Sequence, residues 1–203
     1  MLYFHKTPMI IQKVFSGLEW KGIPESKKIY LTFDDGPIPE ITPWIIDVLK
    51  DFDAKATFFC VGENVKNHPE IFSKIIKNGH SVGNHTYSHI NGFNHSPELY
   101  LENVAKCNEL IQSNLFRPPY GKLTWRQYIQ LKKKYRIIMW DVLSGDFDSS
   151  MSASDCIKAI KKYVRPGSIV VLHDNLKAIH KLKSFLPSLM DYFSSKGFCL
   201  NGL

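Results

Sequence analysis

The sequence predicts an α/β protein whose parallel strands form a closed or nearly closed barrel, with an open doubly wound sheet as the alternative. Strand-like and helix-like segments alternate about seven times without an internal linker. Polar side chains follow the strand-like segments, at Asp34, His85, Arg117, Asp146 and His173. In a barrel these strand ends converge on one mouth, so the placement of the polar residues favours the barrel.

Six segments have the composition of β-strands. β-Branched and aromatic residues dominate the longer ones, and a turn or a polar residue follows most of them. The first begins at Lys28 and breaks at the turn Asp34-Asp35-Gly36-Pro37. In chain order, the predicted strands cover residues 28–33, 56–61, 81–83, 136–142, 168–172 and 198–200.

Amphipathic segments alternate with these strands. In the first of them, apolar residues recur at helical spacing after Thr42-Pro43, where Thr42 is the predicted N-cap and Pro43 the first helical residue. Gly79 stops the second helix. In chain order, the predicted helices cover residues 42–51, 69–77, 97–113, 124–134, 153–164 and 178–194.

Length and composition are those of a single globular domain. Hydrophobic residues make up 44% of the 203 residues, and a chain of this length buries a core by itself. No apolar run approaches the roughly 20 residues that cross a bilayer. The first fifteen residues carry Lys6, Pro8 and Lys13 where a signal peptide needs an unbroken apolar stretch. We therefore expect a cytoplasmic protein without a transmembrane segment, with export by a route that the sequence does not show as the alternative.

The charge balance does not predict a nucleic-acid partner. The net charge is +7, but the positive residues are spread along the chain. The one dense run, Lys132-Lys133-Lys134, is typical of a solvated helix face. An anionic glycan or another cell-envelope partner is compatible with this charge.

Two motifs have the residue types of a catalytic metal site. His85 and His89 are four residues apart, a spacing that places two imidazoles on one face of a helical turn. Two histidines and one carboxylate, such as Asp35, leave coordination positions open for water and substrate. Gly36 begins a turn that can bring Asp34 and Asp35 into one pocket, although the pair alone also suits a structural Asx turn.

Two further motifs carry groups suited to proton transfer and charge pairing. His173 follows an apolar strand, and imidazole titrates near neutrality, which suits a general acid. Prolines stiffen the segment Arg117-Pro118-Pro119-Tyr120-Gly121, so that Arg117 could hold an ionised carboxylate such as Asp34. A structural histidine and a rigid connector are the alternative interpretations.

The chain from about Ile29 to Leu203 resembles the polysaccharide deacetylase family, which is carbohydrate esterase family four or the nodulation-protein deacetylase homology domain. The resemblance depends on four ordered motifs: Thr32-Phe33-Asp34-Asp35-Gly36-Pro37, His85-Thr86-Tyr87-Ser88-His89, Arg117-Pro118-Pro119-Tyr120-Gly121 and Ile169-Val170-Val171-Leu172-His173-Asp174. It implies a distorted (β/α)7 barrel in one domain. It also implies metal-dependent hydrolysis of N-acetyl, or sometimes O-acetyl, groups of glycans such as chitin oligomers, peptidoglycan or xylan.

The resemblance also implies roles and boundaries. Residues 28–203 would form the catalytic domain, and residues 1–27 an extension packed on the barrel. The metal ligands would be Asp35, His85 and His89, with zinc as the usual ion and cobalt or nickel as substitutes. The other implied roles are the base Asp34, the acid His173, Arg117 positioning Asp34, Asp146 orienting His173, the Tyr120 N–H facing the oxyanion and Leu172 against the acetyl methyl.

Two positions depart from the family pattern. Phe147 stands where the family usually has Trp, and Leu143 where it usually has Asp. These departures affect the groove wall and leave the implied catalytic residues intact. Two other functions remain open at this point: a hydrolase of small cyclic amides or ureides, and a catalytically silent glycan-binding domain.

Overall fold

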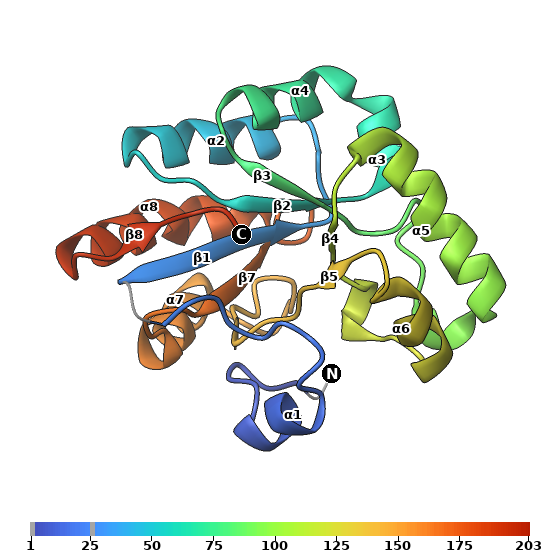
Figure 1. Ribbon diagram of the computed structural model, residues 1–203. Helices are drawn as coiled ribbons and strands as arrows, with labels where there is room; N and C mark the ends of the chain where they lie inside the picture. The colour runs from blue at the N-terminus through green and yellow to red at the C-terminus, as the bar shows by residue number, and fades with distance from the viewer. Residues whose placement is uncertain (1–2, 25–26) are drawn as a thin grey trace.

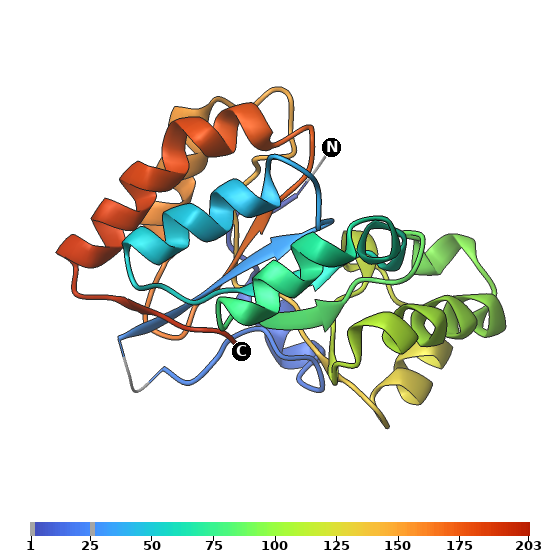
Figure 2. The same cartoon turned by 90° about the horizontal axis from the view of Figure 1, so that it is seen from above.

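The computed structural model describes residues 3–24 and 27–203, and its centre is a curled parallel sheet (Figures 1 and 2). The strands follow the order β5-β4-β3-β2-β1-β7-β6, and β8 pairs with the start of β1. Their bounds are β1 (Lys28–Asp34), β2 (Thr57–Cys60), β3 (Ser81–Asn84), β4 (Leu115–Phe116), β5 (Arg136–Ile137), β6 (Val142–Leu143), β7 (Ile169–His173) and β8 (Cys199–Leu200). The predicted fold class is confirmed: one domain holds a parallel half-barrel of seven strands.

The predicted strand over residues 136–142 is wrong. Its two ends form β5 and β6, which lie at opposite ends of the strand order. The sheet curls until its two edges approach each other, and residues 138–141 pass from one edge to the other. Arg117 donates to the carbonyl groups of Ile138 and Met139 in this crossing, so these groups are not available for a continuous ladder.

Apart from α1, the helices lie around the outside of the sheet (Figure 1). Their bounds are α1 (Met9–Val14), α2 (Thr42–Asp51), α3 (Gly62–Asn67), α4 (Pro69–Lys77), α5 (Pro97–Ile111), α6 (Trp125–Leu131), α7 (Ala153–Tyr163) and α8 (Ile179–Ser195). The sequence predicted all of them except the short α1 and α3. Thr42 is not the N-cap of α2, because Ile41 occupies that position and the Thr42 hydroxyl bonds Asp174 instead. Over the described residues, no helix is long and apolar enough to cross a membrane.

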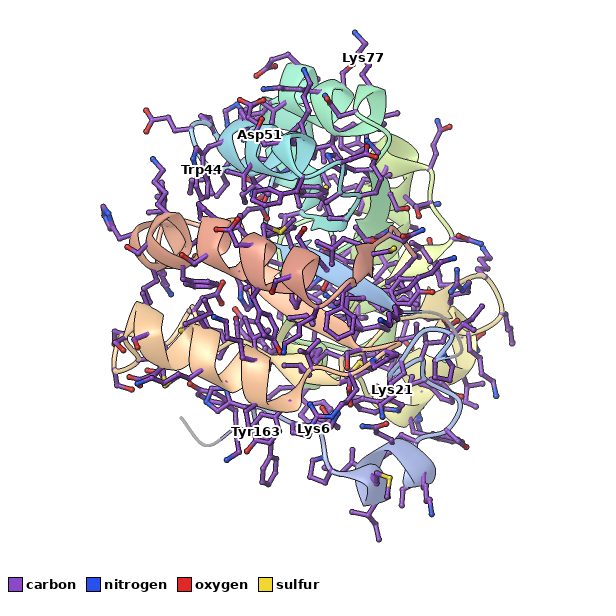
Figure 3. All side chains as sticks on the ribbon, turned by 90° about the vertical axis from the view of Figure 1, so that its left-hand side faces the viewer. Lys6, Lys21, Trp44, Asp51, Lys77 and Tyr163 are labelled. Atoms are coloured by element: carbon purple, nitrogen blue, oxygen red, sulfur yellow. The ribbon has the colours of Figure 1, made fainter. Side chains whose placement is uncertain are left out.

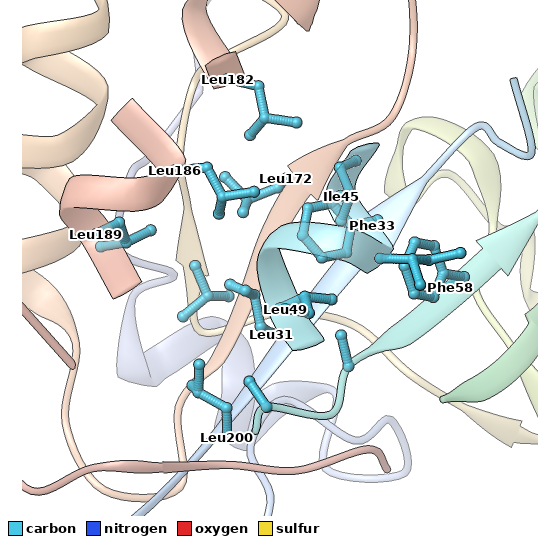
Figure 4. Close-up of a cluster of buried hydrophobic side chains, with 14 of the residues drawn as sticks. Leu31, Phe33, Ile45, Leu49, Phe58, Leu172, Leu182, Leu186, Leu189 and Leu200 are labelled. Atoms are coloured by element: carbon cyan, nitrogen blue, oxygen red, sulfur yellow. The ribbon is translucent and has the colours of Figure 1, made fainter. Parts of the chain in front are cut away.

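The sheet separates two sets of buried side chains. On the outer face, Leu31 and Phe33 of β1 pack with Leu172 of β7 and with the apolar sides of α2 and α8 (Figure 4). On the inner face, Tyr30 packs with Phe59 and other apolar residues inside the curl. Alternation along β1 therefore directs Thr32 and Asp34 toward the inside, above this apolar floor.

The segment before β1 covers the open side of the curl. Lys6 forms an antiparallel bridge with Val142 of β6, and Glu19 forms a parallel bridge with Ile138 beyond β5. The fully buried Asp141 joins this segment to the sheet, because it accepts hydrogen bonds from Lys6 at 2.6 Å and from Ser168 at 2.7 Å. The ammonium group of Lys21 lies 3.7 Å from Asp141. Figure 3 shows Lys6 and Lys21 on the side of the molecule that carries α1.

Replacing Asp141 by alanine is expected to lower the free energy of unfolding by about 3 kcal/mol, since it leaves buried donors and the Lys6 ammonium without their acceptor. Asp47→Ala is the matched control, because its ion pair with Lys74 at 2.9 Å is exposed and contributes about 1 kcal/mol or less. Urea unfolding of both variants measures the difference. Equal losses in the two variants would show that Asp141 does not anchor the N-terminal segment.

Candidate active site

One cavity of about 740 Å³ lies at the carboxyl ends of the parallel strands. Asp34 and His173 are the last residues of β1 and β7, and His85 directly follows β3. These three side chains line the cavity together with three other predicted site residues, Asp35, His89 and Tyr120. Arg117 and Asp146 follow β4 and β6 and lie beneath the lining, fully buried. The strand ends converge as the sequence analysis expected.

Asp35, His85 and His89 form a compact group of potential metal ligands. One ligand atom from each residue lies within 4.8 Å of the others. Oδ1 of Asp35 is 3.0 Å from Nε2 of His89 and 3.6 Å from Nε2 of His85. Burial alone would raise the pKa of Asp35, but hydrogen bonds from the two imidazoles hold it well below its ordinary value. The carboxylate therefore stays charged over the whole neutral range.

The two histidines approach each other through a turn and not through the predicted helical spacing. Thr86 and His89 have left-handed φ values of 63° and 51°, and the segment between them has no helical hydrogen-bonding pattern. The Asn84 side chain accepts from the Thr86 N–H at 2.9 Å and starts this turn. His85 Nδ1 lies 2.8 Å from the Arg117 carbonyl, which orients its Nε2 toward Asp35.

Asp34 and Arg117 form a buried ion pair. Nη1 of Arg117 donates to Oδ1 of Asp34 at 2.6 Å and to the Thr32 hydroxyl at 2.7 Å. The guanidinium also lies 4.1 Å from the centre of the Phe59 ring, so apolar surface covers its other side. With five donors and a fixed plane, Arg117 leaves Asp34 one orientation, in which Oδ2 faces the cavity side 4.0 Å from His85 Nε2.

A sharp turn lets adjacent carboxylates share the cavity. Successive side chains of a strand point to opposite faces, but Asp35 has a φ of 88° and leaves the strand geometry. Asp174 stabilises this turn by accepting from the Gly36 N–H at 2.9 Å and from the Thr42 hydroxyl at 2.6 Å. A Cβ at Gly36 would lie 1.8 Å from the Asp174 carboxylate, so the turn has room for glycine only.

His173 and Asp146 form the second charged pair of the site. Asp146 accepts from the His173 backbone N–H at 2.8 Å, and its other oxygen lies 2.7 Å from Nδ1 of the imidazole. Burial disfavours the charged imidazole, but the Asp146 carboxylate, with smaller contributions from Asp35 and Asp34, raises the pKa of His173 to about 9. His173 therefore holds a proton at neutral pH and directs Nε2 away from Asp146.

Leu172 does not line the cavity, which corrects the role that the resemblance implied. It is fully buried in the outer cluster, close to Leu186 in Figure 4. Because side chains alternate along β7, Val171 points inward and supplies apolar surface to the cavity instead. Tyr120 does line the cavity, and its φ of 61° places the backbone in a left-handed turn.

The two departures from the family pattern are both in the cavity wall. Leu143 contributes apolar surface there, and the Phe147 ring lies 5.1 Å from the His173 ring, edge to face. Tyr3 and Trp140 also line the cavity, although no sequence pattern singles out either residue. Polar residues that follow a strand stand out in a sequence as candidate site residues. Aromatic residues in a cavity wall cannot be distinguished from core residues in the same way.

Two asparagines that the sequence analysis missed hold Asp35 in place. Asn175 Nδ2 donates to Oδ2 of Asp35 at 2.6 Å, and Asn64 Nδ2 donates to the Asp35 carbonyl at 2.7 Å. The first bond occupies the oxygen that does not face the histidines, so Oδ1 remains directed at the imidazoles. The position of Asn175, two residues after His173, was the only signal available in the sequence.

The chain is similar to known deacetylases. A family model for polysaccharide deacetylase matches residues 21–138. A peptidoglycan-N-acetylglucosamine deacetylase of Bacillus cereus is 35% identical over 161 residues, which cover 76% of this chain and 58% of that relative's length. A chitooligosaccharide deacetylase of Azorhizobium caulinodans is 36% identical over 156 residues, covering 72% of this chain and 73% of the relative.

The fold gives the same result. The crystal structure of the Bc1960 peptidoglycan N-acetylglucosamine deacetylase superposes with a TM-score of 0.83 at 30% identity, covering 97% of this chain and 95% of that one. The family model covers more than half of the 203 residues. The chain therefore belongs to the polysaccharide deacetylase family, carbohydrate esterase family four.

Proposed function

We propose that this protein hydrolyses the N-acetyl groups of an acetylated amino sugar in a glycan, with the help of a divalent metal ion. The observation that carries the proposal is the convergence of two different charged pairs, Asp34 with Arg117 and His173 with Asp146, on the cavity that also holds the ligand group. Amide hydrolysis needs a proton acceptor for water and a proton donor for the departing amine. The two pairs supply one of each.

The ligand group fits a zinc ion, with cobalt and nickel as substitutes. It offers one carboxylate oxygen and two imidazole nitrogens, the donor set of catalytic sites that keep open coordination positions. Hydrogen bonds to His85 and Asp35 from outside the group orient these ligands before any ion binds. When bound, the metal acts as a Lewis acid toward the acyl oxygen and makes water more acidic.

The side chains of the protein carry the protons. Asp34, oriented by Arg117, accepts a proton from the water that attacks the acetyl carbonyl carbon. The Tyr120 N–H is the proposed donor to the oxygen that becomes negative. His173 then gives its proton to the amine nitrogen as the C–N bond breaks, so the amine leaves as a neutral group. Acetate and the free amino sugar are the products, and one water is consumed.

The cavity wall suits the acetyl group and the sugar. Val171, Leu143 and Trp140 supply apolar surface for the acetyl methyl, and Tyr120 and Phe147 supply aromatic faces for a pyranose ring. The named relatives act on peptidoglycan and on chitooligosaccharides, both of which carry N-acetylglucosamine. We therefore place N-acetylglucosamine glycans first among the candidate substrates, ahead of O-acetylated xylan.

Acetate release tests the proposal. Zinc-loaded protein is expected to release acetate from at least one of a panel of N-acetylglucosamine oligomers, peptidoglycan fragments and acetylated xylan. A chelated sample should release none, and activity should return when zinc is added. If no substrate is deacetylated although zinc is bound, the deacetylase proposal is wrong. Hydrolysis of a small cyclic amide or sugar binding without turnover would then identify which other function applies.

Asn175→Ala should weaken zinc binding about tenfold, the usual effect of removing a partner that orients a ligand. The change leaves Oδ2 of Asp35 without its donor, so the carboxylate can rotate away from the histidines. Titration of metal-free protein with zinc measures the affinity directly and does not depend on turnover. The exposed Asn67→Ala is the matched control. Equal affinities in the two variants would exclude a positioning role for Asn175.

A further inference from the structure

Tyr3 reaches the cavity from outside the region that matches the family model, which begins at residue 21. The backbone of His5 pairs with that of Leu143, whose N–H donates to the His5 carbonyl at 2.9 Å. Nδ1 of His5 lies 2.9 Å from the Leu143 carbonyl, and Lys6 bridges to Val142. These contacts add the N-terminal segment to the edge of β6 and bring Tyr3 beside the loop that carries Asp146 and Phe147.

The Tyr3 ring extends the aromatic wall of the cavity. Its centre lies 5.2 Å from that of Phe147 at 54°, and Phe147 in turn lies 5.1 Å from the His173 ring. The Phe147 ring thus lies between the rings of Tyr3 and His173, so Tyr3 is farther than Phe147 from His173, the proposed proton donor. Tyr3 therefore lines the same cavity as His173, with the Phe147 ring between them.

The hydroxyl end of Tyr3 lies beside Asp148. Partial burial and the neighbouring Asp148 carboxylate raise the pKa of Tyr3 to about 12, so the phenol keeps its proton. Asp148 itself accepts from the Ser150 hydroxyl at 2.7 Å and from the Ser150 N–H at 2.9 Å. A ring that packs against Phe147 and His5 and lines the cavity loses little conformational entropy when a sugar packs against it.

We propose that Tyr3 is a substrate-binding residue that packs against the sugar unit next to the acetylated one and so makes the enzyme prefer oligosaccharides to single sugars. The inference rests on the proposed glycan deacetylase function. Aromatic faces pack against the C–H groups of pyranose rings, and the phenol adds a polar tip at the edge of the cavity. The specificity surface would therefore include a residue that the family model does not cover.

The test compares Tyr3→Ala, Tyr3→Phe and Phe4→Ala in the full chain. Phe4 is the neighbouring aromatic residue, is exposed, and does not line the 740 Å³ cavity. A purification tag belongs at the C-terminus, which lies far from the cavity. Leu203 bonds Thr57 and Ser81, the first residues of β2 and β3, whereas the cavity lies at the carboxyl ends of the strands. Acetate release is measured with an N-acetylglucosamine tetramer and with 4-nitrophenyl acetate, which carries an acetyl group and no sugar.

Tyr3→Ala is expected to raise KM for the tetramer about fivefold, the effect of losing one aromatic contact, without changing hydrolysis of 4-nitrophenyl acetate. Tyr3→Phe keeps the ring and loses only the hydroxyl, so KM for the tetramer should rise less than in Tyr3→Ala. Phe4→Ala should stay close to the unaltered protein. An equal loss on both substrates would overturn the proposal, because Tyr3 would then act by positioning the Asp146 loop. Unchanged kinetics on both would overturn it as well.

Tetramer binding provides a readout that does not depend on turnover. Calorimetric titration of the metal-free chain with the tetramer should give weaker binding for Tyr3→Ala than for Phe4→Ala. If the unaltered protein releases no acetate from any substrate, the proposed function fails, and this titration still decides the role of Tyr3. Identical affinities of the two variants would exclude Tyr3 from the sugar-binding surface.

Discussion

Asp34→Asn is expected to lower kcat/KM for acetate release by about 10³-fold or more, because it removes the proton acceptor and leaves the shape of the site unchanged. The asparagine oxygen can still accept the hydrogen bond from Arg117, so the side chains that line the cavity should keep their positions. Zinc content should also remain, since the three proposed ligands are Asp35, His85 and His89. Acetate release and bound zinc are measured on the same preparation.

The same substitution should also destabilise the fold. Arg117 is fully buried, and Asp34 is the acidic group in contact with it among the described residues. Removing the countercharge leaves a buried cation, which costs about 3 kcal/mol of unfolding free energy. Asp53→Asn is the control, because Asp53 is an exposed carboxylate far along the chain from the site motifs. Full activity of Asp34→Asn would exclude Asp34 as the base, and loss of zinc would assign it to the ligand group instead.

The sequence allowed the polar groups of the site to be predicted because they follow strands. A parallel strand ends where its apolar run stops, and neighbouring parallel strands end at the same edge, so Asp34, His85 and His173 had to converge. Asp146 was harder to place, because the run that precedes it breaks into β5 and β6 on opposite edges of the sheet. No residue between Ile137 and Val142 indicates this crossing.

The face of each strand could not be predicted in the same way. β7 is apolar from Ile169 to Leu172 and buried on both sides, so alternation cannot tell which residues point inward. The resemblance implied that Leu172 contacts the acetyl methyl, and the uniform apolar pattern of β7 does not show that Val171 is the residue that lines the cavity. The spacing of His85 and His89 suited a helix equally well, and the left-handed φ values that make the turn leave no signature at Thr86 or His89.

The N-terminal segment was predictable only as an extension. Its contacts depend on Asp141, which reads as one polar residue within an apolar run, and on a short edge pairing at Lys6. Two-residue strands and single bridges lie below the length at which residue patterns are informative. Long-range packing alone therefore decides that Tyr3 reaches the cavity.

Asp146→Asn is expected to move the alkaline limb of the pH profile to lower pH and to reduce kcat about 100-fold at pH 8. His173 acts as the proposed acid only while it is protonated, so activity falls as the pH rises through its pKa. The carboxylate of Asp146 raises that pKa to about 9 against the opposing effect of burial. Without the negative charge, burial dominates and the imidazole loses its proton earlier.

Stability should follow the same titration. A histidine whose pKa is higher in the folded state than in the unfolded state, where it is about 6.5, stabilises the fold fully below that pH. This contribution is lost as the pH rises toward 9, so unfolding free energy should decline over that window in the unaltered protein and less so in Asp146→Asn. Ser144→Ala is the control, because it removes a hydrogen bond to Asp146 at 2.9 Å and keeps the carboxylate. If the two variants instead show the alkaline limb of the pH profile at the same pH, a group other than His173 donates the proton. In that case the His173–Asp146 pair serves only to hold the end of β7.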